Sequence, residues 1–320
     1  EILTADDPDQ AAAAVVPLYA GVSVIAGGPG TGKTYTLARM LGMLSRLSAT
    51  PALIALAAPT GKAAARMDES MARALAGMPA DLAQQLGGLR ATTIHRLLGW
   101  VPDSRNRFRH HRFNPLPYDV VVIDEASMVS VTLMARLLEA MRPQARLVLV
   151  GDPNQLAPVE AGAVLADIAE APTHELPELR AALDRLSLDA PARPVALLRR
   201  NHRSGAVLGS LAAAILAGDA DTAIALAQAG RPEIGLSASA ADSGLRERAV
   251  TNGVAMIEAA VAGDIATALA ELDRHRLLCA HRSGPFGVSH WSRQVEDWIG
   301  AVLPGFDAAG SWYAGRPVLI

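Results

Sequence analysis

A glycine-rich stretch near the start of the chain has the composition and spacing of a phosphate-binding loop. Residues 27–34 read Gly-Gly-Pro-Gly-Thr-Gly-Lys-Thr and fit the pattern G-x-x-x-x-G-K-[ST]. Glycines let backbone N–H groups wrap a phosphate, and a helix that begins at the loop points its positive end at the same group. Lys33 would reach the β- and γ-phosphates, and the Thr34 hydroxyl would ligate Mg²⁺. We therefore predict an ATP site with Mg²⁺, formed by Gly28, Gly30, Thr31, Gly32, Lys33 and Thr34.

Two acidic residues follow an apolar run farther along the chain. Asp124 and Glu125 come directly after Val120–Ile123, and ligand-binding residues of open α/β sheets gather at the carboxyl ends of strands. Asp124 would hold Mg²⁺, and Glu125 would orient or deprotonate an attacking water. One acid at a strand end is commonly just solvated. Two acids downstream of a phosphate loop favour a catalytic site.

A third polar segment ends the next apolar run. Residues 151–155 read Gly-Asp-Pro-Asn-Gln, and by composition alone this segment is a good turn and nothing more. Its place in the series gives it weight, because it follows the acidic pair. We therefore predict that Gln155 contacts the γ-phosphate and reports hydrolysis.

These residues need a scaffold, and the apolar pattern of the chain predicts one. Short apolar runs without polar alternation are separated by helix-length segments, which is typical of a parallel sheet covered on both faces. We predict an α/β fold with a doubly wound parallel sheet. The expected strands are Val22–Ala26, Leu53–Ala57, Val120–Ile123, Leu147–Val150, Pro194–Leu198 and Arg276–Ala280, and the clearest helices are Thr34–Leu47, Lys62–Ala76 and Val131–Met141.

A shift in composition after Ile168 suggests two domains. Residues 170–194 are rich in proline dipeptides, and residues 207–230 and 243–273 are alanine-rich with a helical pattern. We predict a first domain at residues 1–170, which carries the loop, the acidic pair and the sensor. Residues 171–320 would form a linker, a helical region and the start of a second domain. The chain lacks an initial methionine, and we expect it to be a segment of a longer protein.

Composition narrows the class of protein. The 320 residues are 51% hydrophobic, carry a net charge of −3 and include one cysteine, Cys279, so an internal disulfide framework is excluded. The acidic start does not resemble a signal peptide, and no run approaches the ~18 apolar residues of a membrane span. We predict a cytoplasmic protein with no membrane partner. The low net charge gives no overall basic footprint for nucleic acid, although a local cleft could still bind a strand.

In this order the segments resemble the motifs of superfamily 1 helicases, and their amino-acid sequences are similar to those of the RecD-like branch. Gln10 resembles the glutamine that reads adenine. Arg203 resembles the arginine that reaches the γ-phosphate. The matching segments are Ala-Pro-Thr-Gly-Lys-Ala-Ala at 58–64, Thr-Thr-Ile-His-Arg-Leu-Leu-Gly at 92–99, Asp-Glu-Ala-Ser-Met at 124–128, residues 151–156, Leu-Arg-Arg-Asn-His-Arg-Ser at 198–204, and residues 276–288.

The resemblance implies a motor protein. Its two domains would be RecA-like P-loop NTPase domains, the second one incomplete here. It implies ATP-driven 5′-to-3′ movement on single-stranded DNA, together with RecB-like and RecC-like partners, as the RecD-like subunit of exodeoxyribonuclease V in double-strand break repair and recombination. The family's later motifs would lie beyond Ile320, so we expect the segment alone to hydrolyse ATP weakly. The implied catalytic residues are Lys33, Glu125, Gln155 and Arg203.

Predicted DNA contacts compete with plainer interpretations. The resemblance favours strand contacts by Thr60, Lys62, Thr93 and His95. The two threonines could instead cap helices, and a lone histidine is more often structural. Residues 105–113 combine arginines with two phenylalanines, which suits strand binding or a solvated surface hairpin. Elsewhere, we expect Trp291 and Trp298 to share one packed helix face, and Cys279 to lie in a core strand.

Three other functions remain open. A nucleotide kinase would also have a phosphate loop, but residues 151–155 and 201–204 have no obvious task in it. A nucleotide-binding regulatory subunit would have no need for Lys33, Asp124, Glu125, Gln155 and Arg203 together. A free-standing RecD-like helicase without nuclease partners fits the same motifs.

Overall fold

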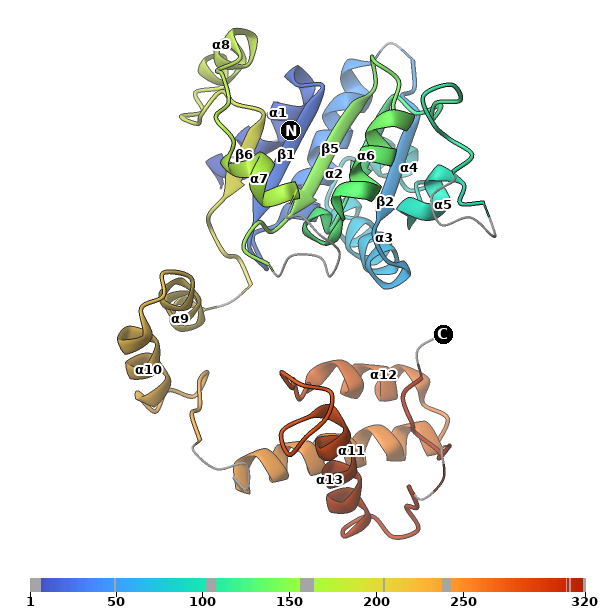
Figure 1. Cartoon of the computed structure of the whole chain (residues 1–320), viewed down its shortest axis with the longest axis vertical. Helices are drawn as coiled ribbons and strands as arrows, with labels where there is room; N and C mark the ends of the chain where they lie inside the picture. Colours follow the sequence, from blue (N-terminus) through green and yellow to red (C-terminus); the bar gives the residue numbers. More distant parts are fainter. Residues whose placement is uncertain are drawn as a thin grey trace. The chain divides into compact units, whose positions relative to one another are not determined.

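The structure, a computed structural model, describes residues 7–48, 50–101, 108–155, 164–203, 205–237, 243–308, 310 and 312–318. The chain forms two compact units that divide between Leu226 and Ala227. The first unit carries a sheet, and the described part of the second is built around helices (Figure 1).

A six-stranded sheet with the order β3-β2-β4-β5-β1-β6 forms the centre of the first unit. Every neighbouring pair is parallel, so the carboxyl ends of all six strands lie at one edge. The strands are β1 (Val22–Gly27), β2 (Ile54–Ala58), β3 (Ala91–Thr93), β4 (Val120–Ile123), β5 (Arg146–Gly151) and β6 (Val195–Leu198). Five of the expected strands are present, and β3 was not expected.

Helices cover both faces of this sheet, which confirms the predicted doubly wound α/β architecture (Figure 1). Alternate residues of a strand face opposite sides. In β4, Val120 and Val122 pack with one helical layer, whereas Val121 and Ile123 pack with the other. The first layer holds α1 (Pro8–Tyr19), α2 (Lys33–Leu47), α3 (Gly61–Leu75) and α4 (Ala80–Leu86), and the second holds α5 (Ile94–Leu98), α6 (Val131–Ala140) and α7 (Val164–Glu170).

A smaller cluster extends the first layer beyond the sheet. Ala12, Val15 and Val16 of α1 pack against Leu179 and Leu183 of α8 (Pro177–Arg185). α1 therefore contacts α2 on one side and α8 on another. This packing fixes the start of α1 next to the glycine-rich loop, as described below.

The second unit contains α11 (Ser243–Val261), α12 (Ile265–Arg274) and α13 (Val288–Gly300). α11 packs against both of the other helices. The rings of Trp291 and Trp298 on α13 lie 6.0 Å apart between centroids, as expected for one packed face. Two helices, α9 (Ala206–Leu216) and α10 (Ala220–Gln228), precede this unit, and the division between units falls inside α10.

The strand predicted at Arg276–Ala280 is wrong for the described structure. These residues are in no regular element and join no ladder. A strand needs a neighbour, and the described residues of the second unit offer this segment none. Cys279 is half-buried instead of lying in a core strand.

The division between units falls later than the predicted domain boundary near residue 170. β6 pairs with β1 in the first sheet, so the chain returns to the first unit after the proline-rich stretch. That the second unit begins another RecA-like domain stays a prediction.

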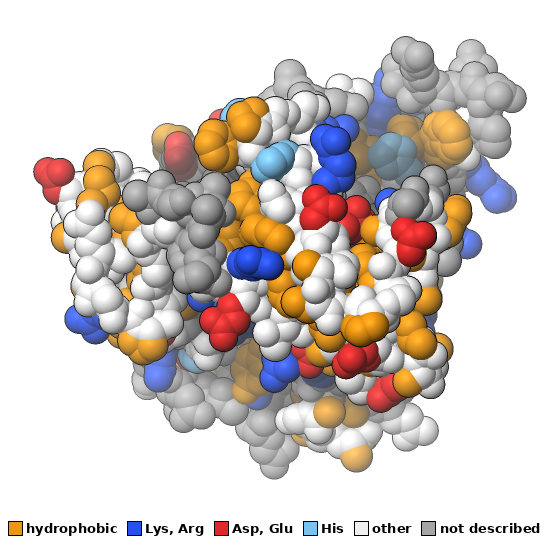
Figure 2. Space-filling view, turned by 90° about the horizontal axis from the view of Figure 1, so that it is seen from below, with side chains coloured by type: hydrophobic (Ala, Val, Ile, Leu, Met, Phe, Trp, Pro, Cys, Tyr) orange, Lys and Arg blue, Asp and Glu red, His pale blue; other side chains and the backbone are white. Residues whose placement is uncertain are grey.

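The described surface mixes charges of both signs. Basic and acidic side chains are interspersed among apolar ones on the face shown in Figure 2, in line with the net charge of −3. Across the described ranges, none of the helices has both the length and the apolar character required to cross a bilayer.

Candidate functional site

The predicted site residues collect at the carboxyl edge of the sheet. The phosphate loop follows β1, the acidic pair follows β4, Gln155 follows β5 and Arg203 follows β6. These four strands are consecutive neighbours in the sheet. Topology alone therefore brings together segments that are up to about 170 positions apart in sequence, as the contact between Asn201 and Pro29 illustrates.

The loop takes its shape from two glycines in the left-handed region. Gly30 has φ 79° and Gly32 has φ 83°, a conformation that costs most other residues energy. Gly32 begins α2. The buried Thr31 donates its hydroxyl to the Gly28 carbonyl oxygen at 2.9 Å. The turn directs the start of α2 at the space above the loop, as phosphate binding requires.

Lys33 lies folded onto this loop among charged groups. Its Nζ donates to the carbonyl oxygens of Gly27 at 2.7 Å and Gly28 at 3.1 Å. Burial lowers the pKa of Lys33. The carboxylates of Asp152, Glu125 and Asp124 act in the opposite direction, and the Arg203 guanidinium lowers it further. The structure thus brings Lys33 within electrostatic reach of the acidic pair and of Arg203.

The acidic pair is held tightly at the end of β4. Burial raises the pKa of Asp124, and the charge of Glu125 adds to this, whereas the Glu125 N–H, which donates to Asp124 Oδ1 at 2.9 Å, and Lys33 oppose it. Glu125 has φ 50° and ψ 40°, which is strained for a residue with a side chain. Strain of this kind concentrates at functional sites.

The residues around Asp124 fit a magnesium ion. Mg²⁺ binds few protein oxygens and takes the rest of its ligands from substrate phosphates and water. Within the described ranges there is no group of three or more His, Cys, Asp or Glu residues that could hold a metal. A site formed by protein ligands alone is therefore absent from those ranges. A carboxylate whose charge is disfavoured by burial gains most from a nearby cation. Asp124 and the Thr34 hydroxyl are the groups that would hold the ion.

The segment after β6 lies directly on the phosphate loop. Asn201 Nδ2 donates to the Pro29 carbonyl oxygen at 2.9 Å, and Asn201 Oδ1 accepts from the Arg203 N–H at 2.8 Å. The His202 N–H donates to the Gly30 carbonyl oxygen at 2.8 Å. A Cβ atom on Gly30 would come within 2.7 Å of Asn201 Oδ1 and 2.8 Å of the Arg203 Cβ. The contacts leave no room for a side chain at Gly30, and they bring Arg203 to the loop.

Gln10 and Gln155 lie at this edge without an established role. Gln10 is buried in α1, and its Nε2 donates to the Thr31 carbonyl oxygen at 2.9 Å. To read a base through Nε2, the amide would have to give up this bond. Gln155 is exposed, and its N–H closes the turn to the Asp152 carbonyl oxygen at 3.2 Å. Adenine recognition and phosphate sensing by these two residues stay predictions.

The predicted DNA-contacting residues lie at the other end of the same edge. Thr60 follows β2, and Thr93 ends β3 beside it. Both act as helix caps: Thr60 accepts from the Ala63 N–H and Thr93 from the Arg96 N–H, each at 3.2 Å. The cap interpretation is therefore confirmed. Each hydroxyl still has a proton to donate, so the DNA contact stays a prediction.

Lys62 and His95 are exposed beside these caps. The His95 ring lies 5.9 Å from the Phe108 ring. Residues 105–107 of the basic stretch lie outside the described residues. Its later part forms a small antiparallel bridge between His111 and Asn114, with the Arg112 guanidinium 4.5 Å from the centre of the exposed Phe113 ring. This is the geometry of a surface hairpin, and its Phe108 lies beside His95, one of the residues predicted to contact DNA.

Sequence reasoning assigned no role to three residues of the site. Asp152 is buried near Lys33 and accepts from the Asn154 N–H at 3.0 Å. Asn201 organises the segment that carries Arg203, and Asp7 contacts the neighbouring His202 at 2.7 Å. An acid after the strand-like run 147–150 was a usable signal for Asp152. Nothing local marks the contact of Asp7 with His202, because the two residues are 195 positions apart.

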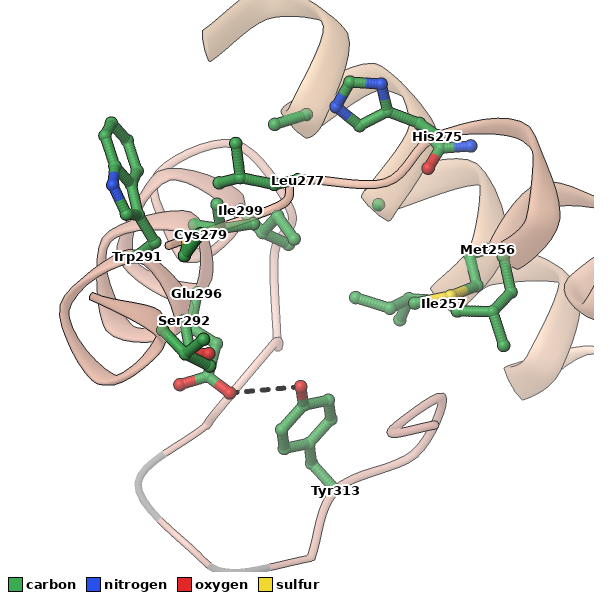
Figure 3. Close-up of a pocket in the computed structure, with 16 residues that line it drawn as sticks. Met256, Ile257, His275, Leu277, Cys279, Trp291, Ser292, Glu296, Ile299 and Tyr313 are labelled. Atoms are coloured by element: carbon green, nitrogen blue, oxygen red, sulfur yellow. Dashed lines mark hydrogen bonds between the residues drawn. The ribbon is translucent and has the colours of Figure 1, made fainter. Parts of the chain in front are cut away.

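A separate cavity of about 280 Å³ lies inside the second unit (Figure 3). Apolar residues of α11 and α13 line much of it, together with Leu277 and Cys279 of the extended segment. The Tyr313 hydroxyl donates to Glu296 Oε1 at 3.2 Å, and burial, reinforced by Glu296, raises the pKa of Tyr313. This cavity contains none of the predicted site residues.

Comparison with known proteins identifies close relatives over nearly the full chain. The sequence profile described as an AAA domain matches residues 10–161. The RecBCD enzyme subunit RecD of Mycolicibacterium smegmatis is 51% identical over 316 residues, which covers 98% of this chain and 54% of that protein. The corresponding subunit of Mycobacterium tuberculosis is 49% identical over 318 residues, with 98% and 52% coverage.

Two further matches cover only part of the chain. The ATP-dependent RecD2 DNA helicase of Deinococcus radiodurans is 41% identical over 157 residues, 49% of this chain and 19% of that protein. The Pif1 helicase structure from Candida albicans aligns with a TM-score of 0.40 at 20% identity, over 78% of this chain and 54% of that one. The chain spans about half the length of the curated relatives that match it throughout.

Proposed function

The chain belongs to the RecD family, and from this premise we propose that it is the ATP-binding motor portion of a DNA helicase that moves along single-stranded DNA. One observation supports the proposal most directly. A single sheet edge carries a phosphate loop, an acidic pair and an arginine at one end, and helix-capping threonine hydroxyls with basic neighbours at the other. A motor must couple its two sites, because hydrolysis at one has to change the grip at the other, and this sheet edge connects them directly.

Each residue of the nucleotide end has a task in this proposal. Lys33 would leave the carbonyl oxygens of Gly27 and Gly28 and neutralise the β- and γ-phosphates. Glu125 would orient the attacking water and accept its proton. Arg203 would stabilise the charge that develops on the γ-phosphate. Bound Mg²⁺ would supply further neutralisation of the phosphate oxygens, with Asp124 and Thr34 as its protein ligands.

The partners in this proposal are single-stranded DNA and RecB-like and RecC-like subunits. The relatives described above that match 98% of the chain are named as RecBCD enzyme subunits, whereas the ATP-dependent RecD2 DNA helicase of Deinococcus radiodurans matches 49%. Membership of such a complex is therefore favoured over a free-standing helicase. We propose 5′-to-3′ movement in the cytoplasm during double-strand break repair. We also expect residues 1–320 alone to bind ATP and hydrolyse it weakly.

The test is ATP hydrolysis by the full-length protein with and without single-stranded DNA. We expect the DNA to raise kcat at least about tenfold, since a motor couples hydrolysis to its track. Double-stranded DNA without an end provides the control. Turnover that is rapid and indifferent to DNA would favour a different phosphate-loop enzyme. ATP binding without turnover, with and without partner subunits, would favour a regulatory subunit.

A further inference from the structure

The first turn of α1 makes two connections that differ in purpose. Asp7 is the N-cap of α1, and its Oδ1 accepts from the Gln10 N–H at 3.2 Å. Its second oxygen, Oδ2, lies 2.7 Å from Nε2 of His202. A carboxylate can only accept, so the imidazole donates this bond from Nε2. Capping requires one oxygen only, and the second contact therefore needs its own explanation.

The second contact joins α1 to the segment that carries Arg203. Asp7 is only 6% exposed, and a hydrogen bond to a buried carboxylate is among the stronger ones. On the other side of the segment, the His202 N–H and the Asn201 amide both bind phosphate-loop carbonyl oxygens. Residues 201–203 are thus held between two supports, the loop beneath and Asp7 beside.

We propose that Asp7 is a positioning residue for hydrolysis, acting through His202 to hold Arg203 against the phosphate loop. The proposal rests on the proposed function, in which Arg203 stabilises the γ-phosphate. A guanidinium that must meet developing charge acts best when its backbone is already fixed. Asp7 and Gln10 lie on the same turn, and Gln10 binds the loop at Thr31. The start of α1 therefore holds both the loop and the arginine-bearing segment.

Substitutions at Asp7 can separate capping from positioning. Serine is as good an N-cap as aspartate, but its shorter side chain cannot cap the helix and also reach Nε2 of His202. Asparagine keeps the length and shape of the side chain and removes the charge: its oxygen can still accept from the Gln10 N–H, and its NH2 can donate to Nε2 of His202 in the other neutral tautomer of the imidazole. Asp7→Ser therefore tests the contact to His202 with the cap preserved, and Asp7→Asn is its conservative partner.

The kinetic test measures DNA-stimulated ATP hydrolysis by these variants in the full-length protein. We expect Asp7→Ser to lower kcat about tenfold with little change in KM for ATP, because misplaced transition-state groups act on kcat. Asp7→Asn should retain most of kcat. His202→Ala should match Asp7→Ser, and the double variant should be no worse than either, because the two residues act through one contact. Equal losses in Asp7→Ser and Asp7→Asn, or additive losses in the double variant, would overturn the proposal.

A second readout does not depend on turnover. Hydrogen exchange of the amides of His202 and Arg203 should quicken about tenfold in Asp7→Ser and stay near the wild-type rate in Asp7→Asn, since local opening sets their protection. Unchanged exchange in Asp7→Ser would contradict the positioning role even if hydrolysis behaves as proposed. If the variants show this exchange pattern but the wild-type protein lacks DNA-stimulated hydrolysis, the proposed function is refuted, whereas the contact between Asp7 and His202 is upheld.

Discussion

The two units of the chain differ in how completely they bury their apolar side chains. In the first unit, alternate residues of each central strand reach a helical layer on either face, and residues such as Leu149 and Ile25 are fully buried. In the second unit, an extended segment without a described partner strand borders a cavity of about 280 Å³, and Leu278 is 89% exposed. The first unit closes its own core, whereas the second leaves part of its core open.

This contrast indicates where the chain depends on other residues. An unpaired extended segment beside an apolar cavity is the arrangement that an added strand would complete. The relatives that match 98% of the chain are about twice as long as the region they share with it. We propose that residues of the longer protein complete the second unit as a RecA-like domain. The ATP chemistry proposed above needs no such completion for binding.

The largest expected effect tests whether that chemistry belongs to the first unit alone. In the full-length protein, Glu125→Gln should lower the rate of ATP hydrolysis by about 10²–10⁴-fold, because a general base is lost while the shape is kept. ATP binding should persist. Glu296→Gln is the matched control, since Glu296 also lies in a pocket, bonded to Tyr313 in the second unit, and it should keep the rate within about twofold. A comparable loss in both variants would erase the contrast between the units.

Stability gives the next test. Leu149 is fully buried in β5, and Leu277 is 36% exposed beside the cavity. Leu149→Ala should lower the free energy of unfolding by about 2–5 kcal/mol, and Leu277→Ala by less than about 1 kcal/mol, because a loosely packed site loses little when it is truncated. Chemical denaturation of residues 1–320 measures both. Equal costs would show that the second unit is as well packed as the first.

A smaller effect concerns the DNA side of the first unit. Replacing Arg109 and Arg112 by glutamine should weaken single-strand binding and reduce the slope of log K against log salt by about 0.7 for each phosphate that the protein no longer neutralises. The control pair is Arg274 and Arg276, which contact Glu271 and Asp273 in the second unit. Their replacement should leave the slope unchanged. If the slope of log K against log salt changes only in the control pair, the DNA contact lies in the second unit and not on the predicted hairpin.

The smallest effect separates stability from function inside the first unit. Burial raises the pKa of Asp124, so the folded state favours the protonated form more than the unfolded state does. This stabilisation is present below the ordinary pKa and is lost as pH rises through the raised one. Asp124→Asn should therefore raise Tm by a few degrees at neutral pH without Mg²⁺, and the gain should vanish at acidic pH.

A residue with the opposite shift controls for this prediction. The pKa of Asp119 is lowered, chiefly by the Leu53 N–H and also by Arg142. Its charged form is favoured in the folded state, so this stabilisation is present above the ordinary pKa and is lost as pH falls. Asp119→Asn should lower Tm at neutral pH. The same sign for both variants would contradict the assigned causes.

Much of the first unit was predictable because its signals are local. The spacing of residues 27–34 fixes a strand, a turn and a helix start together, and the apolar run 120–123 followed by two acids marks a buried strand that ends at a site. β3 was missed because three residues, Ala91–Thr93, are too few to show a pattern. The cap role of Thr60 could be anticipated from sequence, since a cap needs only the next three residues.

The remainder depends on contacts between distant residues. Arg276–Ala280 has the composition of a strand, but pairing depends on a neighbour that sequence periodicity does not supply. Two contacts arise only once β6 lies beside β1: that of Asp7 with His202, and the hydrogen bond from Asn201 to the Pro29 carbonyl oxygen. The same topology explains why Asp152 reaches Lys33. Sequence patterns identified the segments, and the order of the strands decided which of their residues meet.

The sheet order has one more consequence, for how far a mechanical signal must travel. Asp124 directly follows β4, whose neighbours in the sheet are β5 towards the phosphate loop and β2 towards Thr60. From β4 to β3, which ends in Thr93, there are two strand spacings, roughly 10 Å. If a phosphate bond is hydrolysed at the loop, as proposed, the resulting displacement would reach the hydroxyls of Thr60 and Thr93 through this one sheet, without passing through a hinge.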